Sequence, residues 1–326
     1  MFRPFILLLF CSSFLPLSGE SPIERVVFVS CFKESKKAPA MAQIARSRPD
    51  VFIWMGDNIY GDSEDMAVLR KKYQVAASNP DYVKIQDSAR VIGTWDDHDF
   101  GKNDVGREFA KKRESQQEFL DFLKVAPDSP RRKREGVYAK HDFGPQGRQV
   151  RVILLDTRYH RDAIGSNGTI LGEEQWRWLE RSLRESPAEV NLLVSSIQVL
   201  PSEHRFEKWA DFPEEKARLL ALLAEEKVPP VLILSGDRHL GEISLKDQGS
   251  SYPLYEVTSS SLNSSFGGNS KEVNRLRVGE NFGRNNFGML TLSWGGDFPV
   301  IEAAVCDENG EKVLKAKFSL QKSSPK

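Results

Sequence analysis

The segment VFIWMGDNIYGD, Val51 to Asp62, joins five apolar residues to a cluster of oxygen-bearing side chains. The run VFIWM has the length and composition of a buried β-strand. Asp57, Asn58 and Tyr60 follow it within five residues. Carboxylates beside a core cost free energy unless a cation or a hydrogen-bond network compensates their charge. The segment therefore predicts either a metal site at the end of a strand or a polar turn.

Other apolar segments end in the same way. RVVFVSC ends at Cys31, and RVIGTW (90–95) runs into the acidic stretch DDHD. In open α/β sheets, ligands bind at the carboxyl ends of the strands. Each cluster alone is typical of a turn, but close carboxylates repel unless cations lie between them, so several such strand ends predict a metal centre. The side chains concerned are Cys31, Asp57, Tyr60, Asp96, Asp97, His98, Asp99, Asp156, Arg158, Asp237, Arg238 and His239.

Composition limits the class of protein. The chain has 326 residues, of which 40% are hydrophobic, as expected for a globular protein with a large core. Lys plus Arg number 46 and Asp plus Glu number 46, so the formal net charge is zero. This balance argues against a general binder of nucleic acid or of anionic membranes, which would carry a basic surface.

The first 19 residues are typical of a secretory signal peptide. Arg3 precedes a short apolar run from Phe5 to Leu17, and the small residues Ser18 and Gly19 follow. The alternative is a membrane anchor, but the run is too short to cross a hydrocarbon core of about 30 Å as a helix. We therefore expect export to the periplasm or the exterior, and we expect no transmembrane segment in the rest of the chain.

Two cysteines remain after the predicted leader, Cys31 and Cys306. They are too few for a disulfide framework. They could pair with each other in an oxidising compartment. Alternatively, Cys31 has a different role and Cys306 is a small apolar residue in a late strand.

The order of elements predicts a single α/β domain over residues 20–326. Strand and helix patterns alternate first, and strand patterns dominate the last hundred residues, which suits two packed sheets with helices outside them. Asn309-Gly310 predicts a hairpin turn. Residues 259–275 predict either a lid over a cleft or a mobile surface loop, and residues 131–135 a solvated basic loop. Helices are expected at 38–47, 65–77, 80–89, 107–124, 172–186 and 213–227.

Five motifs, taken in order, resemble the alkaline phosphatase D (PhoD-like) family, a branch of the calcineurin-like metallophosphoesterases. They are Cys31 and the runs GDNIYGD, WDDHD, LDTRYHR and SGDRH, within residues 25–245. The resemblance implies a four-layer sandwich of two mixed β-sheets flanked by helices. Ser30-Cys31 stands where the wider superfamily has Asp-x-His, and Ser195, Ser196 and Gln198 stand near a missing superfamily histidine. Both changes are shared with the PhoD-like branch.

The resemblance also implies a site for Fe³⁺ and Ca²⁺. Cys31, Asp57 and Tyr60 would bind the iron, and Asp57 would bridge to a calcium site where Asp97 and Asp237 are expected ligands. His239 stands where the superfamily keeps a metal-binding histidine. Thiolate and tyrosinate are anionic donors that favour trivalent iron, and carboxylates are the usual calcium ligands. Asn103 and Asp104 are further candidates for the calcium site, whereas Asp62, Asp96 and Asp99 are expected to support ligands or form turns.

The resulting expectation is an exported phosphohydrolase. A metal-activated oxygen would attack the phosphorus of a small or polymeric phosphate mono- or diester, and His98 would protonate the leaving group. Arg158 and Arg238 are candidates to clamp phosphate oxygens. The alternatives are an ion pair between Arg158 and Asp156 and an outward-facing Arg238. Other functional readings are a phospholipase-type phosphodiesterase of the same fold and a non-catalytic secreted calcium-binding protein.

Overall fold

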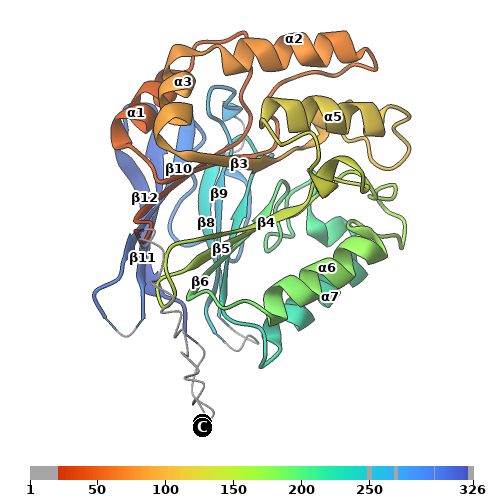
Figure 1. Cartoon of the computed structure of the whole chain (residues 1–326). Coiled ribbons are helices and arrows are strands. Elements are labelled where there is room, and N and C mark those ends of the chain that lie inside the picture. Colours follow the sequence, from red (N-terminus) through yellow and green to blue (C-terminus); the bar gives the residue numbers. More distant parts are fainter. Residues whose placement is uncertain (1–20, 248–251, 268–270, 297, 322–326) are drawn as a thin grey trace, which may run out of the picture.

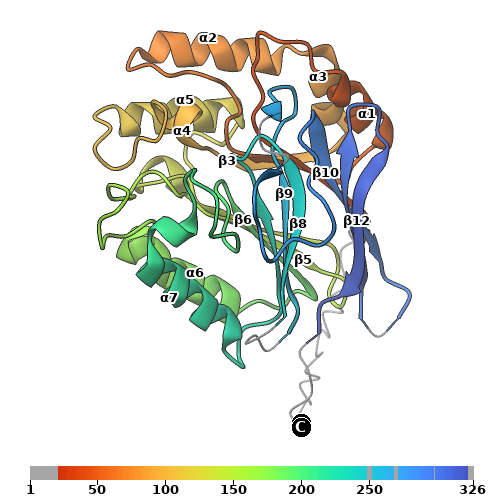
Figure 2. The same cartoon turned by 180° about the vertical axis from the view of Figure 1, so that it is seen from behind.

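The computed structural model describes residues 21–247, 252–267, 271–296 and 298–321. Its layers follow the order helices, sheet, sheet, helices, which confirms the predicted four-layer α/β sandwich (Figures 1 and 2). The predicted signal peptide, residues 1–19, lies outside the described residues. Within the described ranges, no helix has both the length and the apolar character needed to cross a bilayer.

The first sheet has six strands in the order β12-β11-β10-β1-β2-β3. The three early strands are parallel, so their carboxyl ends lie at one edge. The three late strands extend the sheet beside β1, each antiparallel to the strand before it in the sheet. Gly310, with φ of 87°, turns the hairpin between β11 and β12, as the sequence predicts. The strands are β1 (Arg25–Val29), β2 (Val51–Met55), β3 (Arg90–Thr94), β10 (Asn286–Ser293), β11 (Val300–Asp307) and β12 (Lys312–Ser319).

The second sheet also has six strands, in the order β4-β5-β6-β7-β9-β8. Four central strands are parallel, and the edge strands β4 and β8 are antiparallel to their neighbours. The edge strand β4 pairs antiparallel with β5. The strands are β4 (Ala139–Phe143), β5 (Val150–Leu154), β6 (Val190–Ser195), β7 (Val231–Ser235), β8 (Gly241–Lys246) and β9 (Leu254–Ser259).

Alternating strand residues divide the core into three layers. Phe28 and Ile53 point between the sheets, where they join Leu192 in one buried cluster. Trp54, on the opposite face of β2, packs under the helices of the first sheet, and Leu193 packs under those of the second. The first helical layer contains α1 (Pro39–Ser47), α2 (Met66–Ala77), α3 (Pro80–Ser88) and α5 (Lys112–Phe122), and the second contains α6 (Gly172–Arg184) and α7 (Pro213–Ala224).

Several local features differ from the expectation. The helix predicted at 107–124 begins only at Lys112. The DDHD stretch is not a simple loop, because Asp97–Phe100 form a short helix, α4. Short 3₁₀ helices occur at Pro130–Arg132 and Trp209–Asp211. The possible disulfide is wrong: Cys31 and Cys306 are both free and buried, and Cys306 belongs to β11.

Candidate metal centre

Side chains from several strand ends meet at one edge of the sandwich. Asp57 follows β2 and Asp97 follows β3, while Asp237 and His239 follow β7 in the other sheet. Cys31, Asp57, Asp237 and His239 all have left-handed backbone conformations, with φ between 52° and 64°. Such conformations cost of order 1–3 kcal/mol for a non-glycine residue and cluster at functional sites. The fold therefore holds these four residues in backbone conformations that an unconstrained chain would avoid.

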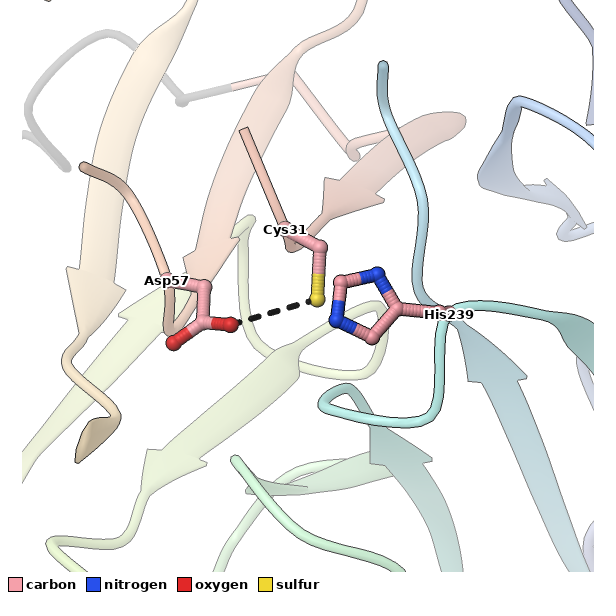
Figure 3. A group of neighbouring side chains, drawn as sticks. All are labelled: Cys31, Asp57 and His239. Carbon is pink, nitrogen blue, oxygen red and sulfur yellow. Dashed lines mark hydrogen bonds between the residues drawn. The ribbon is translucent and has the colours of Figure 1, made fainter. Parts of the chain in front are cut away.

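The first group of ligands surrounds the thiol of Cys31. Its Sγ lies 3.4 Å from Asp57 Oδ2, and the His239 ring faces it from the other side (Figure 3). Candidate ligand atoms of these three residues lie within 4.8 Å of one another. The hydroxyl of Tyr60 is buried nearby and has no hydrogen-bond partner among the described residues. A thiol, a phenol, a carboxylate and an imidazole therefore face one small region.

Two further groups of ligands extend from this region. Asp57, Asp97 and His98 form one, and Asp96, Asp97 and Asp237 form the other, each with candidate ligand atoms within 4.8 Å of one another. Asp97 belongs to both groups, and its Oδ2 accepts the Asp104 N–H at 2.7 Å. The last group offers only carboxylate oxygens, which suits a hard cation such as Ca²⁺.

The electrostatics of Asp57 indicate that a positive charge belongs in the centre. Burial and the negative charges of Cys31 and Asp97 raise the pKa of Asp57 well above its usual range. Asp57 Oδ1 and Asp96 Oδ2 are buried without hydrogen-bond partners among the described residues. Burial also raises the pKa of the Tyr60 hydroxyl. A cation at this position would compensate these charges and satisfy the buried oxygens.

Cys31 and His239 form a charge pair even without a cation. Burial opposes ionisation of the thiol, but the positive charge of His239 and hydrogen bonds lower the pKa of Cys31 to about 6. The Cys31 charge in turn raises the pKa of His239 to about 9. Ser260 supports both residues, since its Oγ lies 3.0 Å from Cys31 Sγ and accepts the His239 N–H at 2.9 Å. Cys31 thus has a thiolate character suited to metal binding.

His98 is held at the opening of the site. Its Nδ1 lies 2.7 Å from Asp62 Oδ1, and its ring packs against that of Tyr60 with 4.3 Å between centroids. Burial favours the neutral ring, but Asp62 and Asp97 outweigh it and raise the pKa of His98 to about 9. The shift favours the protonated ring, the form that can donate a proton.

The two predicted arginines take different positions. Arg158 is fully buried below the site, where it pairs with Asp96 at 2.5 Å and with Glu207 at 2.6 Å. Its guanidinium does not line the cavity, so the expected phosphate clamp is corrected to a support for Asp96. The alternative pairing with Asp156 is also wrong, because Asp156 Oδ1 accepts backbone N–H groups of Arg158 and Tyr159. Arg238, by contrast, lines the cavity and pairs with Glu272 at 2.5 Å, so it does not face outward.

A cavity of about 480 Å³ opens over the centre. Asp97, His98, Asp237 and His239 line it, and so do Asn103 and Asp104, the further candidates for the calcium site. A ligand in this cavity would contact at least one member of each candidate metal group, and also the His98 ring. The remaining lining residues are Ile164, Arg205, Phe206, Glu207, Asp211, Arg238 and Phe266.

A family model described as PhoD-like phosphatase matches residues 26–288 of the chain. The chain belongs to the PhoD-like phosphatase family. The match includes every residue of the centre and confirms the resemblance seen in the sequence motifs.

Relatives agree with this assignment. The chain is 22% identical over 277 residues to alkaline phosphatase D of Bacillus subtilis (strain 168), an alignment that covers 69% of this chain and 47% of the relative. The chain thus spans about half the length of this curated relative. A solved structure of PhoD shares the fold with a TM-score of 0.69 at 17% identity, covering 94% of this chain and 73% of the other. A dimetal phosphatase from Danio rerio has a TM-score of 0.61 at 12% identity, covering 92% and 100%.

The donor set of this PhoD-like chain fits a pair of cations. Asp57 Oδ1 and Asp96 Oδ2 have no hydrogen-bond partner in the part of the chain that the structure describes, and buried carboxylates cluster next to a thiol and a phenol. The set with sulfur, phenol and imidazole suits a transition metal, whereas the Asp96, Asp97 and Asp237 set suits a hard cation. Both halves of the centre therefore have the chemistry that a two-metal phosphatase requires.

Some functional residues were missed by sequence reasoning. Ser260 follows β9 directly, so the rule that site residues follow strands could have found it. Ser264 accepts a hydrogen bond from His239 Nδ1 through its carbonyl, which ties residues 259–267 of the predicted loop to the centre. Residues 268–270 of that loop lie outside the described residues. Glu207 gave no sequence signal, because only the fold brings it to Arg158.

Proposed function

We propose that this chain is an exported, metal-dependent phosphohydrolase that cleaves phosphate monoesters, diesters or both. The observation that carries the proposal is that Cys31, Asp57, Asp97 and His239 belong to linked groups of candidate ligands, next to a cavity that Asp97, His98 and His239 line. Membership of the PhoD-like phosphatase family supports the same chemistry. Export rests on the sequence of residues 1–19 alone.

We further propose that the cations are Fe³⁺ and Ca²⁺. Cys31, Tyr60, Asp57 and His239 would hold the iron, whose trivalent state suits anionic sulfur and phenolate donors. Asp97, Asp237 and Asp96 Oδ2 would hold the calcium. Asp57 would lie between the iron and the calcium positions. When bound, the cations would polarise the phosphoryl group and the attacking oxygen.

The chain's own residues would perform the remaining tasks. Arg238 lines the cavity with a side chain that is only 2% exposed, so it can orient a phosphate oxygen without swinging away. His98, protonated and fixed by Asp62, would donate its proton to the ester oxygen as the bond to phosphorus breaks. Arg158 would not contact the substrate. It would act by keeping Asp96 in place.

Replacing Asp57 tests the proposal. The Asp57→Asn variant should lose hydrolysis of 4-nitrophenyl phosphate and of bis(4-nitrophenyl) phosphate, because one charge shared between two cation positions is removed. Asp81→Asn is the matched control, since Asp81 lies in α3, away from the centre, and pairs with the exposed Lys84. Unchanged turnover in Asp57→Asn would refute the bridging role. Assays with added calcium and with a chelator would then compare mono- and diesters.

A further inference from the structure

The cavity over the centre has a chemically mixed lining. It includes carboxylates, histidines and the buried Arg238, and also the apolar side chains of Ile164, Phe206 and Phe266 beside the exposed polar residues Asn103, Asp104 and Arg205. Ile164 is 46% exposed and Phe266 is 54% exposed, which is unusual for large apolar side chains. The three come from separate segments of the chain, so their meeting at one cavity results from the fold. We call these three residues the apolar rim.

The segments that carry the apolar rim are fixed to the site. Glu207, next to Phe206, pairs with the buried guanidinium groups of Arg158 at 2.6 Å and Arg161 at 2.9 Å. The Arg238 guanidinium lies 4.3 Å from the centroid of the Phe206 ring. This part of the cavity lining is therefore built before any ligand arrives.

The other two rim residues are tied down in a similar way. The Ser264 carbonyl contacts His239 Nδ1, two residues before Phe266. Ile164 lies in a loop whose ends are joined by hydrogen bonds between Asp162 and Thr169, in both directions at 2.9 Å. Apolar groups held rigidly in water gain free energy by burial against a ligand and lose little conformational entropy in binding it.

The size of the cavity also points to more than a phosphate. A volume of about 480 Å³ lies in the range of sites for drug-sized ligands and leaves room beyond a phosphoryl group. The organic group of a phosphate ester bound among Asp97, Asp237 and Arg238 would lie in the same cavity as the apolar rim.

We propose that the apolar rim selects phosphate esters whose organic group is aromatic or similarly large, flat and apolar. The inference rests on the proposed function, because it assigns the substrate class of the same site. Aromatic rings bury large areas against Phe and Ile side chains and add favourable ring–ring contacts. Small hydrophilic esters such as glycerol phosphate would leave the apolar rim in contact with water and would gain no binding free energy from it.

The test compares benzyl and methyl phosphates, whose leaving alcohols have similar acidity, as monoesters and as diesters. The wild-type chain should prefer benzyl esters in kcat/KM by about tenfold or more, as expected for contact with aromatic side chains. Phe266→Ala and Ile164→Ala should each reduce this benzyl-to-methyl ratio severalfold. Phe266→Trp should retain it, because the ring is kept.

A matched control tests whether the effect belongs to the apolar rim and not to exposed apolar side chains in general. Phe298 is 51% exposed and lies outside the cavity, so Phe298→Ala should keep the wild-type ratio. Equal kcat/KM for benzyl and methyl esters, or a ratio that Phe266→Ala leaves unchanged, would overturn the inference while hydrolysis itself persists. Failure to hydrolyse any ester would instead overturn the proposed function.

Discussion

At the scale of single residues, Asp62 orients His98 and favours its charged form. Asp62 accepts a hydrogen bond from Nδ1 at 2.7 Å. Burial favours the neutral ring, but this bond and the charge of Asp97 raise the pKa of His98 to about 9. The sequence suggested only a turn or supporting role for Asp62. The structure gives that support a specific partner.

Asp62→Asn tests this arrangement. The variant should lower kcat by about 10- to 100-fold for alkyl phosphates, because the ring loses the charge that keeps it protonated and oriented. For 4-nitrophenyl phosphate, whose leaving group needs no proton, the loss should be much smaller. Steady-state rates across a series of leaving groups would measure the difference. An equal loss for all leaving groups would mean that Asp62 acts only on folding or metal binding.

Residue types at strand ends could be read from the sequence, but their partners could not. Cys31, Asp57, Asp97 and His239 were expected together, and the fold brings them together. Arg158 was expected near phosphate, yet it is buried with Asp96 and Glu207. No local pattern distinguishes an arginine that contacts substrate from one that holds a carboxylate, because the choice depends on which distant acid the fold supplies.

At the scale of elements, the strands and helices were predictable because their apolar periods are strong. The short helix α4 was not, since four residues are too few to show a period. It is stabilised by Asp99, whose side chain accepts the Asp96 N–H at 2.7 Å. The acidic stretch that signals a metal centre thus also builds the turn that presents Asp97.

Close packing between β1 and β10 depends on a glycine. Gly288 pairs with Phe28 across the strands, and a Cβ at this position would lie 2.0 Å from the Phe28 ring. Gly288→Ala should therefore lower the free energy of unfolding by about 1–3 kcal/mol through overpacking. Gly283→Ala is the control, since among the described residues no atom beyond its chain neighbours lies within 4 Å of its added Cβ. Denaturant unfolding would measure both, and equal stability would contradict the tight contact.

At the scale of the whole molecule, two parallel sets of strands direct their carboxyl ends to one edge of the sandwich. This geometry explains why ligands far apart in the sequence form one centre. The strand patterns predicted that these side chains would meet. How the two sheets pack, and how residues 259–267 contact the centre, could be seen only in the folded chain. The loop contributes Ser260, which contacts the centre from the opposite sheet.

Acid stability of the fold is expected to depend on His141 in β4. Burial and then the positive charge of Arg131 lower the pKa of His141 to about 4, below its usual value of about 6.5. The unfolded chain therefore binds the proton first, so stability is complete above about pH 6.5 and falls as the pH drops toward 4. His141→Phe should remove up to roughly 3 kcal/mol of this loss of stability at low pH. Denaturant unfolding from pH 4 to 8 would measure it, and identical slopes in both proteins would contradict the assignment.

The most direct test of the central claim is elemental analysis of the purified chain, paired with hydrolysis of bis(4-nitrophenyl) phosphate before and after chelation. We predict bound iron and calcium, a colour from tyrosinate-to-iron charge transfer that Tyr60→Phe abolishes, and turnover that stops when the metals are removed. A colourless, metal-free protein that hydrolyses the ester at an undiminished rate in chelator would contradict the account.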